Sequence, residues 1–519
     1  MSKDSSDQLF LLIKSLGRSE KRYFKLWVQR NAETQTKYYS LFESIDGQER
    51  FDQQAILKSE KSIKAQQLPN LKAHLYKRLL QALRQFELDK TEEIQLREYI
   101  DYIQVLYNRG LYKQCEDMIK KTGRKIEKSG HLELKLELLK WEKLVLKRLV
   151  GHDYQSKVKQ IISHVEDANN KINLINKINN LSVQLNALYL QHGYVRNAQQ
   201  QVLTENLVNK QMPDYKENEL SLYERFHLYR LLAIYYSFLE ELDNSRFYAE
   251  KWLRLFTDNK SLQQNNIDDY LQAINQVMLV QYKRYEYHAF MKTRKLLRQV
   301  RQQHAGTKNL TIKSRIEKYI YVHEFNRIFM LGDFAFGAAL LKRIGSRLND
   351  FIDGLDAHSR VILYYKVACL YVGNDEHRKA LEWLNRIQDE TQDDLREDVI
   401  SFARILSLIA HYELGNTEVM EYYIRSTYRF LLKKGDLNQY QKYILAFLRK
   451  LASGFKEDDL LPEFKRLLIK LKSLQEVRYE QRAFIYFDVI SWLESKLSNS
   501  AVSKIIQHKA IKRIEAEVY

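Results

Sequence analysis

Apolar residues at helical spacing, interrupted by short turns, run through most of the chain. The clearest case is Phe325–Ile344, in which a helical pattern ends at Leu331, Gly332–Asp333 interrupts it, and a second helical pattern begins at once. Glycine ends a helix readily because it adopts the left-handed conformation without a Cβ penalty. Gly337 lies one turn into the second helix, where a bulky side chain would push the two backbones apart. The stretch therefore predicts a hairpin of two antiparallel helices.

The same two positions recur along the chain: a turn residue, often glycine, and a usually small residue five positions later. Glu240, Arg284 and Asp375 stand in place of glycine, and Met420 is large, which indicates degenerate repeats. The second positions follow one another at intervals of 40 to 48 residues, a period typical of stacked helical pairs. We therefore expect an all-α fold, a solenoid of antiparallel helical hairpins. The pairs are Gly110/Cys115, Gly151/Ser156, Gly193/Ala198, Glu240/Ser245, Arg284/Ala289, Gly332/Gly337, Asp375/Ala380 and Gly415/Met420.

Three tyrosines, Tyr189, Tyr236 and Tyr371, each lie four residues before a turn residue. In this respect the hairpins resemble tetratricopeptide repeats, in which a tyrosine is common at that place, and the resemblance covers Glu92–Lys434. Repeats of that family are about 34 residues long with a proline near the end, whereas these are longer and the chain has three prolines. Longer helices, as in HEAT-like or other tetratricopeptide-like solenoids, would fit this spacing.

The segments outside the array divide the chain further. We expect an N-terminal helical module at residues 1–90, the repeat array at 91–434 and a C-terminal helical cap at 435–519. Within the array, the polar stretches Asn197–Asn218 and Asn259–Asp268 are expected to be insertions on one rim, and Ser19 is expected to cap the second helix of the module. The helices expected outside the array are Asp7–Leu16, Glu20–Arg30, Thr36–Ile45, Asp52–Ser59, Pro69–Leu88, Gln439–Leu451, Pro462–Leu474, Ala483–Leu497 and Ser500–Glu517.

Two stretches of the N-terminal module, IKSLGRSEKRYFKL (Ile13–Leu26) and LPNLKAHLYKRLLQALR (Leu68–Arg84), carry a second resemblance. The segment is similar to the N-terminal part of large, uncharacterised helical-repeat proteins of Bacteroidota. This resemblance implies no activity. It implies that the module and the repeat array belong together.

The helix expected from Pro69 has two distinct faces. Leucines and a phenylalanine form an apolar stripe, and the opposite face carries polar and basic side chains of the kinds that contact base edges and phosphates. An ordinary solvated helix face carries the same residue types, so both interpretations stay open. The face that could contact nucleic acid consists of Asn70, His74, Lys77, Gln81 and Arg84.

The composition adds a basic character. The chain of 519 residues has a formal net charge of +18, from 84 Lys and Arg against 66 Asp and Glu. This excess favours an acidic partner, although the basic residues are dispersed along the chain, as on any solvated surface. The apolar run Leu9–Ile13 is too short for a signal-peptide core, and no run approaches the ~20 residues of a transmembrane helix. Cys115 and Cys369 are expected to be buried free thiols, and we expect a cytoplasmic location.

The sequence lacks the common local motifs of catalysis, cofactor binding and metal binding. There is no GxGxxG, no GxxxxGK[ST] and no GxSxG. His323–Glu324 begins like a zinc-protease motif, but Arg327 occupies the place of the second histidine. We therefore expect no enzyme activity and no cofactor or metal.

The remaining candidate surface is the concave face of the array. We expect a partner groove lined by Arg230, Asn326, Arg327 and Lys366. The leading interpretation is a protein-interaction scaffold or adaptor that displays an extended surface to a protein or peptide partner. The alternative is a nucleic-acid-associated regulator whose N-terminal module binds DNA or RNA while the array senses a peptide or dimerises. The oligomeric state, and the choice between one superhelix and two lobes, stay open.

Overall fold

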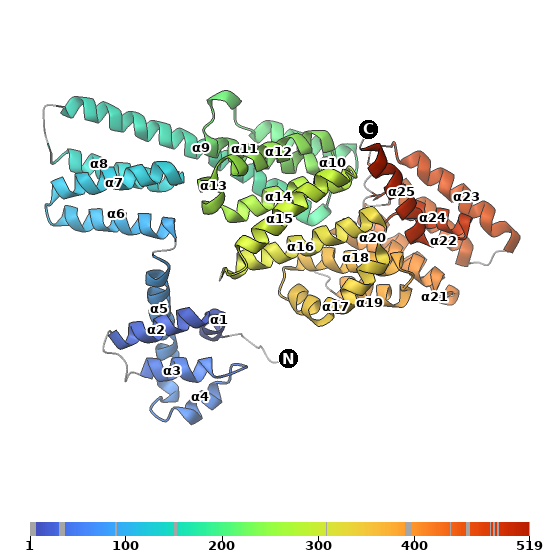
Figure 1. Ribbon diagram of the computed structural model, residues 1–519, viewed down its shortest axis with the longest axis horizontal. Helices are drawn as coiled ribbons and strands as arrows, with labels where there is room; N and C mark the ends of the chain where they lie inside the picture. The colour runs from blue at the N-terminus through green and yellow to red at the C-terminus, as the bar shows by residue number, and fades with distance from the viewer. Residues whose placement is uncertain are drawn as a thin grey trace. The chain divides into compact units, whose positions relative to one another are not determined.

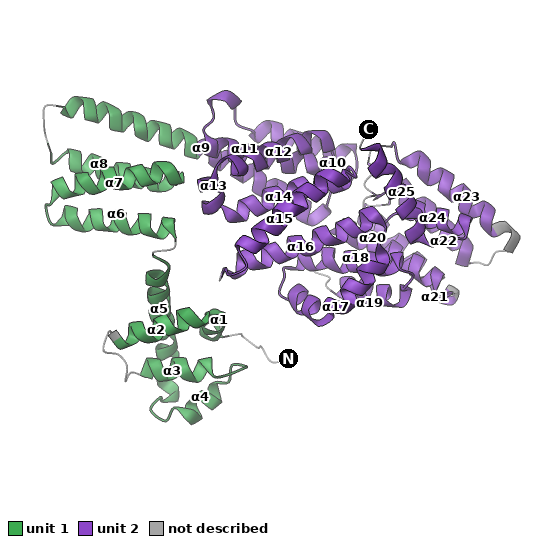
Figure 2. Cartoon of the chain, in the orientation of Figure 1, with its two compact units in different colours: residues 1–172 green, residues 173–519 purple. Residues whose placement is uncertain are grey.

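The computed structural model describes residues 7–30, 37–88, 91–149, 153–307, 309–389, 396–435, 437–452, 457–477, 479–480, 483–484 and 487–517. Every regular element in these ranges is a helix, so the expected all-α class is confirmed for the described part of the chain. The chain divides into two compact units, residues 1–172 and 173–519 (Figure 2). The boundaries expected at residues 90 and 434 stay predictions.

Unit 1 begins with helices packed around one apolar core, to which α5 contributes Leu75 and Leu79. Asp7 caps α1 by accepting hydrogen bonds from two backbone N–H groups of its first turn, and Pro69 lies in the first turn of α5 as expected. A second core follows around Leu96 and Cys115. The helices are α1 (Gln8–Ser15), α2 (Arg18–Arg30), α3 (Lys37–Asp46), α4 (Gln53–Ser59), α5 (Leu68–Glu87), α6 (Glu92–Asn108), α7 (Tyr112–Ser129) and α8 (Leu132–Leu146), and α9 (Tyr154–His192) continues past residue 172 (Figure 1).

Unit 2 contains most of the helical pairs and two large apolar cores. The first core centres on α18 and α20, and the second centres on α11 and α14. The helices are α10 (Ala198–Gln211), α11 (Leu222–Phe238), α12 (Leu242–Asp258), α13 (Lys260–Asn265), α14 (Ile267–Lys283), α15 (Tyr287–Gln303), α16 (Leu310–Leu331), α17 (Phe334–Asp353), α18 (Ala357–Gly373), α19 (His377–Asp389), α20 (Glu397–Glu413), α21 (Thr417–Lys433), α22 (Gln439–Ala452), α23 (Glu457–Leu474), α24 (Val489–Ser498) and α25 (Val502–Ala516).

The first helices of successive pairs in unit 2 form a continuous row. α11 contacts α14, α14 contacts α16, α16 contacts α18, α18 contacts α20, and α20 contacts α22. Each of these helices also packs on the second helix of its own pair, as α18 does on α19. Each pair therefore buries apolar surface on its neighbours in series. We call α11, α14, α16, α18 and α20 the inner row.

Most of the predicted turn positions are confirmed by the backbone. The residues with left-handed φ angles between +57° and +76° include Gly110, Gly193, Glu240, Gly332, Asp375 and Gly415. The turn predicted at Arg284 is wrong by one position. Arg284 has φ −87°, and the next residue, Tyr285, takes the left-handed conformation with φ +56°. Gly151 lies outside the described residues. The second positions Cys115, Ser245, Gly337, Ala380 and Met420 are buried, Ala289 is half-buried, and Ser156 and Ala198 are exposed because the first turns of α9 and α10 face solvent there.

Several expected element boundaries differ in the structure. The helix expected over Pro462–Leu474 begins five residues earlier, at Glu457, and the expected insertion Asn259–Asp268 contains α13. Ser19 lies inside α2 and does not precede it, since this helix begins at Arg18, two residues before the expected Glu20. The expected insertion Asn197–Asn218 contains α10, because the side chain of Asn197 accepts a hydrogen bond from a backbone N–H of the first turn and starts a helix. The helix expected over Ala483–Leu497 begins only at Val489. Asn and Ser thus act at helix starts as readily as in loops, which limits what polarity alone predicts.

Buried ion pairs join two segments of unit 2 that are far apart in sequence. The guanidinium of Arg396 makes two 2.8 Å hydrogen bonds to the Asp398 carboxylate and donates a third, at 3.1 Å, to the hydroxyl of Tyr189, 207 residues away. Nearby, Arg196 pairs with Glu397 at 2.8 Å. Both Arg396 and Asp398 are buried, so loss of either partner would leave a charge in a medium that solvates it poorly.

Gly193 allows this close approach. Its backbone has φ +76°, and a Cβ at this position would overlap the carboxylate of Asp398. Gly415 has a similar φ of +71°, but nothing lies within 4 Å of a Cβ placed there. The two glycines therefore separate the cost of a left-handed backbone from the cost of displacing the buried ion pair.

We predict that Gly415→Ala lowers the free energy of unfolding of unit 2 by roughly 1–2 kcal/mol, the cost of a left-handed alanine. Gly193→Ala should lower it by at least about 3 kcal/mol more, because Asp398 must move away from Arg396. Urea unfolding of the full chain, followed by circular dichroism, measures both variants. Equal destabilisation by the two substitutions would contradict the close packing of Asp398 on residue 193.

Candidate functional site

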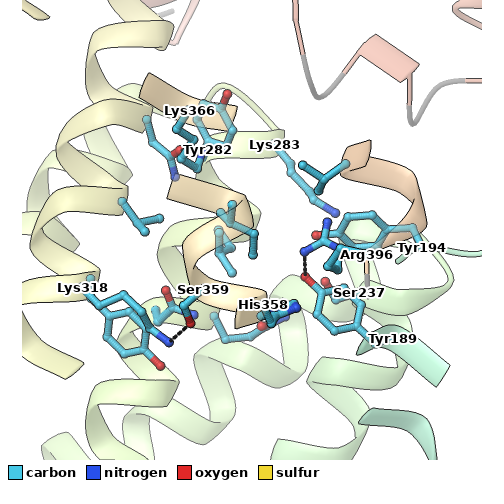
Figure 3. Close-up of a pocket in the computed structure, with 18 of the residues that line it drawn as sticks. Tyr189, Tyr194, Ser237, Tyr282, Lys283, Lys318, His358, Ser359, Lys366 and Arg396 are labelled. Atoms are coloured by element: carbon cyan, nitrogen blue, oxygen red, sulfur yellow. Dashed lines mark hydrogen bonds between the residues drawn. The ribbon is translucent and has the colours of Figure 1, made fainter. Parts of the chain in front are cut away.

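A cavity of about 370 Å³ lies along the inner row of unit 2 (Figure 3). The side chains that line it come from the C-terminal part of α9 and from α11, α12, α14, α16, α18 and α20. A cavity of this size falls within the range of small-molecule sites in proteins. A second hollow, more open to solvent, lies along α24 and α25.

Helical spacing explains why these side chains face the same space. Residues three, four and seven positions apart share one face of a helix, and each inner-row helix turns one such face to the cavity. The lining residues of the three central helices are Gln272, Asn275, Gln276, Leu279, Tyr282 and Lys283 of α14, Lys318, Tyr319, Val322, Asn326 and Phe329 of α16, and His358, Ser359, Ile362, Tyr365, Lys366 and Cys369 of α18.

The cavity is positively charged. Lys283, Lys318, Lys366 and Arg396 line it, and none of its described lining residues is an aspartate or glutamate. Figure 3 shows these cations around the cavity together with Tyr189, Tyr194 and Tyr282. Aromatic rings beside cations supply an apolar wall that also attracts positive charge through the face of the ring.

Two of the four cations have a carboxylate partner behind the wall. Lys283 pairs with Glu240 at 3.3 Å, and its Nζ lies 3.6 Å from the ring centroid of Tyr194. Arg396 is held by Asp398 in the two-bond pair described above. These two charges are therefore compensated within the protein.

The charge of Lys318 is compensated indirectly, by a carboxylate that lies one hydrogen bond further away. Its Nζ donates to the hydroxyl of Ser359 at 3.1 Å, and that hydroxyl donates to the carboxylate of Asp356 at 2.6 Å. Burial lowers the pKa of Lys318, and the nearby Asp356 charge acts in the opposite direction. Asp356 also caps α18, so the same carboxylate starts the helix and stabilises the lysine.

Lys366 has no such carboxylate. Its Nζ donates to the side-chain oxygen of Asn326 at 2.6 Å and lies 5.5 Å and 5.3 Å from the ring centroids of Tyr282 and Phe329. Among the described residues, no aspartate or glutamate makes an ion pair with it. Burial lowers the pKa of Lys366 to about 8, and the charge of Arg396 acts in the same direction.

A chain of amide and imidazole groups holds Lys366 in place. Burial lowers the pKa of His323 to about 3, so this ring is neutral at pH 7 and carries one N–H. The Asn326 amide nitrogen lies 3.4 Å from His323 Nδ1, and His323 Nε2 lies 3.0 Å from the side-chain oxygen of Asn275. All of these hydrogen bonds form if His323 Nδ1 accepts from the Asn326 amide nitrogen and His323 Nε2–H donates to Asn275. The side-chain oxygen of Asn326 then accepts from Lys366.

The structure brings together two of the four residues expected to line a partner groove. Asn326 and Lys366 line the cavity and are hydrogen-bonded to each other. Arg230 and Arg327 are not among the lining residues. Arg230 instead pairs with Asp269 at 3.1 Å, and Arg327 pairs with Glu324 at 2.9 Å. Arg327 follows Asn326 directly, so it lies about 100° around the helix, off the face that lines the cavity.

Sequence reasoning missed Lys283, Lys318 and Arg396. The sequence offered a clue to the two lysines, since each lies at helical spacing from apolar residues that line the cavity. Arg396 carried none, because it reaches the cavity only through contacts with α9, about 200 residues earlier. Cys369 was expected to be buried, and it is a buried free thiol that lines the cavity.

The expected nucleic-acid face lies on α5 in unit 1. Asn70, Lys77, Gln81 and Arg84 are exposed, whereas His74 is partly buried and stacks on Tyr38 with ring centroids 4.2 Å apart. Arg84 pairs with Asp101 at 3.2 Å. His74 therefore packs within the unit, and the other four side chains remain accessible.

The pKa of Lys366 leads to a prediction about stability. The group binds its proton less tightly in the folded chain, with a pKa of about 8, than in the unfolded chain, where the value is 10.5. Between these values the unfolded state holds more protons, so the stability of the wild type should rise by about 3 kcal/mol relative to Lys366→Met as pH increases from 8 to 10.5. Urea unfolding across this range measures it. Lys292→Met, at an exposed position of α15, controls for loss of a surface charge, and parallel curves for wild type and Lys366→Met would refute the prediction.

Comparison with known proteins adds no assignment. No protein-family model matches the chain, and no curated protein matches its sequence. Among the described helices, none combines the length and apolar character that crossing a membrane requires. A functional interpretation therefore depends on the geometry and charge of the cavity in unit 2.

Proposed function

We propose that this chain is a cytoplasmic helical-repeat binding protein. In this proposal unit 2 is a tetratricopeptide-like solenoid that holds an anionic ligand in its cavity. The second helices of its pairs, which we call the outer helices, act as a scaffold for a protein partner. The observation that carries the proposal is the cavity itself, which is lined by Lys283, Lys318, Lys366 and Arg396 and by no aspartate or glutamate among its described lining residues. A concave site with one sign of charge attracts a ligand of the opposite sign.

The serial contacts of the inner row support the solenoid. Each of its helices packs on the next and on its own partner helix, as expected for stacked repeats. The left-handed turn residues between paired helices recur at the predicted intervals, as at Gly332, Asp375 and Gly415. These features fit the tetratricopeptide-like array that the proposal assumes.

The chemistry of the cavity wall supports binding rather than catalysis. Burial raises the pKa of the Cys369 thiol to about 12, which disfavours the nucleophilic thiolate. Burial lowers the pKa of His323 and His358 to about 3, so both imidazoles are weak bases. The amides, neutral rings and cations of the wall are suited to holding a ligand by hydrogen bonds, packing and charge.

Exposed apolar side chains on the outer helices support the scaffold. On α21, Val419, Tyr422 and Tyr423 are all exposed, and their spacing places them on one helix face. Tyr422 is 67% exposed, which is high for a large aromatic residue. Exposed groups of this kind mark protein-interaction surfaces, and they lie on the second helix of a pair, not on the inner row that lines the cavity.

We predict that aromatic anions raise the melting temperature of the full chain and that their neutral amides do not, because only a negative charge satisfies the cationic wall. A ligand at about 100 times its Kd should add about 2.7 kcal/mol of stability. Differential scanning fluorimetry with benzoate, benzenesulfonate and phenyl phosphate, each against a neutral analogue, is the measurement.

A cavity-filling variant locates the effect. Val322→Trp should remove the response, since Val322 lines the cavity, and Val183→Trp should keep it, since Val183 is an exposed residue of α9. The proposal fails if no anion raises the melting temperature, or if the neutral analogues raise it equally.

The exposure of Lys77, Gln81 and Arg84 along α5 supports a second candidate function, nucleic-acid binding by unit 1. If these residues contact phosphates, Lys77→Ala should weaken binding to DNA or RNA and reduce the slope of log affinity against log salt by about 1. Fluorescence anisotropy across a salt series measures the slope. Lys292→Ala is the control, and absence of binding at ~50 mM salt would exclude this candidate.

A further inference from the structure

The charge balance of the cavity defines the kind of anion that fits it. Lys283 is compensated by Glu240, Arg396 by Asp398, and Lys318 by Asp356 through Ser359. Lys366 alone, among the described cations of the wall, donates to a neutral amide and has no carboxylate beside it. One positive charge is therefore left for a ligand to neutralise, which a single negative charge does and a doubly charged group overshoots.

The surroundings of Lys366 define what the anion must be attached to. The rings of Tyr282 and Phe329 lie 5.5 Å and 5.3 Å from Nζ, and Leu279 and Val322 line the same cavity. A ligand that places its charge on Lys366 therefore places its body against aromatic and aliphatic side chains. An apolar or aromatic body gains from this burial, whereas a polar one would lose its hydration.

The lysine is held ready for such a ligand. An ammonium group has three N–H donors, and Asn326 takes one of them at 2.6 Å. Asn326 is itself fully buried and is fixed by His323 and Asn275. The ammonium group therefore has a defined position and two donors left, which is enough for both oxygens of a carboxylate.

The volume of the cavity limits the size of the ligand. A space of about 370 Å³ accommodates a small organic molecule but not a folded domain. We infer that unit 2 binds a small monocarboxylate with an apolar or aromatic body, whose carboxylate accepts hydrogen bonds from Lys366 and whose body packs between Tyr282 and Phe329. This inference rests on the proposed function and narrows its ligand to one chemical class.

The free ammonium group gives binding a pH dependence that belongs to Lys366. With a pKa of about 8 in the empty cavity, it is mostly charged at pH 7 and mostly neutral at pH 9.5. Three titratable groups beside it keep one form between these pH values, because burial raises the pKa of Cys369 to about 12 and that of Tyr282 well above 10, and lowers that of His323 to about 3. Burial also lowers the pKa of Lys318, which lines the same cavity but donates its hydrogen bond to Ser359. Arg396 stays charged throughout. Affinity should therefore fall roughly 30-fold from pH 7 to pH 9.5.

The experiment uses isothermal titration calorimetry on the full chain with phenylacetate and octanoate as probes. We expect both to bind at pH 7, and phenylacetamide, which lacks the charge, not to bind. Lys366→Met should weaken phenylacetate binding on the order of 100-fold, since the anion then lacks its counter-ion in a buried site. Lys292→Met is the control: it removes an exposed lysine of α15 that does not line the cavity, and it should leave the affinity unchanged.

Further ligands distinguish the failure of this inference from the failure of the proposed function. Phenyl phosphate binding as tightly as phenylacetate, or binding only by N-acetylated peptides with a free C-terminal carboxylate, would overturn the small monocarboxylate and leave an anion-binding cavity standing. No binding by any of these anions would overturn both. Phenylacetate affinity that is equal at pH 7 and pH 9.5 in the wild type would overturn the role of Lys366 without depending on the folding of any variant.

Discussion

The buried ion pair between Arg396 and Asp398 is the contact on which the cavity of unit 2 depends. It joins the start of α20 to the end of α9 through the Tyr189 hydroxyl, across 207 residues of sequence. A row of stacked helical pairs has no intrinsic reason to bring such distant segments together, because each pair contacts only its neighbours. Here charge supplies the reason, and the pair Arg196–Glu397 reinforces it. The absence of a side chain at Gly193 leaves room for the Asp398 carboxylate.

This closure determines what the inner row can hold. The polar faces of α14, α16 and α18 would line an open groove if the row stood alone. With Tyr189, Tyr194 and Arg396 added, they line a cavity in which water is scarce and charges act strongly. The low pKa of His323 and the lowered pKa of Lys366 are two results of the same exclusion of water. An uncompensated lysine in such a place lowers stability, and proteins commonly accept that cost at a binding site.

How much the sequence predicts depends on the range of the interactions concerned. The turn at Gly332 could be predicted because a left-handed residue between two helical patterns is a local signal. The turn at Tyr285 could not be predicted, since nothing in the local sequence distinguishes Tyr285 from Arg284 as the residue that takes the positive φ. Asn326 and Lys366 stand out as polar residues on mainly apolar helices, and they do meet. Arg327 has the same character but lies off the face of α16 that lines the cavity, and packing between helices decides which face that is. Arg230 shares the face of Ile234 on α11, but it pairs with Asp269 and does not line the cavity.

The closure also has a consequence for the order in which the chain is made. Helical pairs can fold one after another as they leave the ribosome, because each needs only its predecessor for support. The cavity cannot form in this stepwise way, because one part of its wall is Tyr189 of α9 and another is Arg396, which directly precedes α20. A nascent chain that has already built the inner row as far as α18 still lacks the guanidinium that joins its two ends. The cavity is therefore a property of the finished unit, and a shortened chain that keeps most of its repeats would keep its helices and lose the cavity.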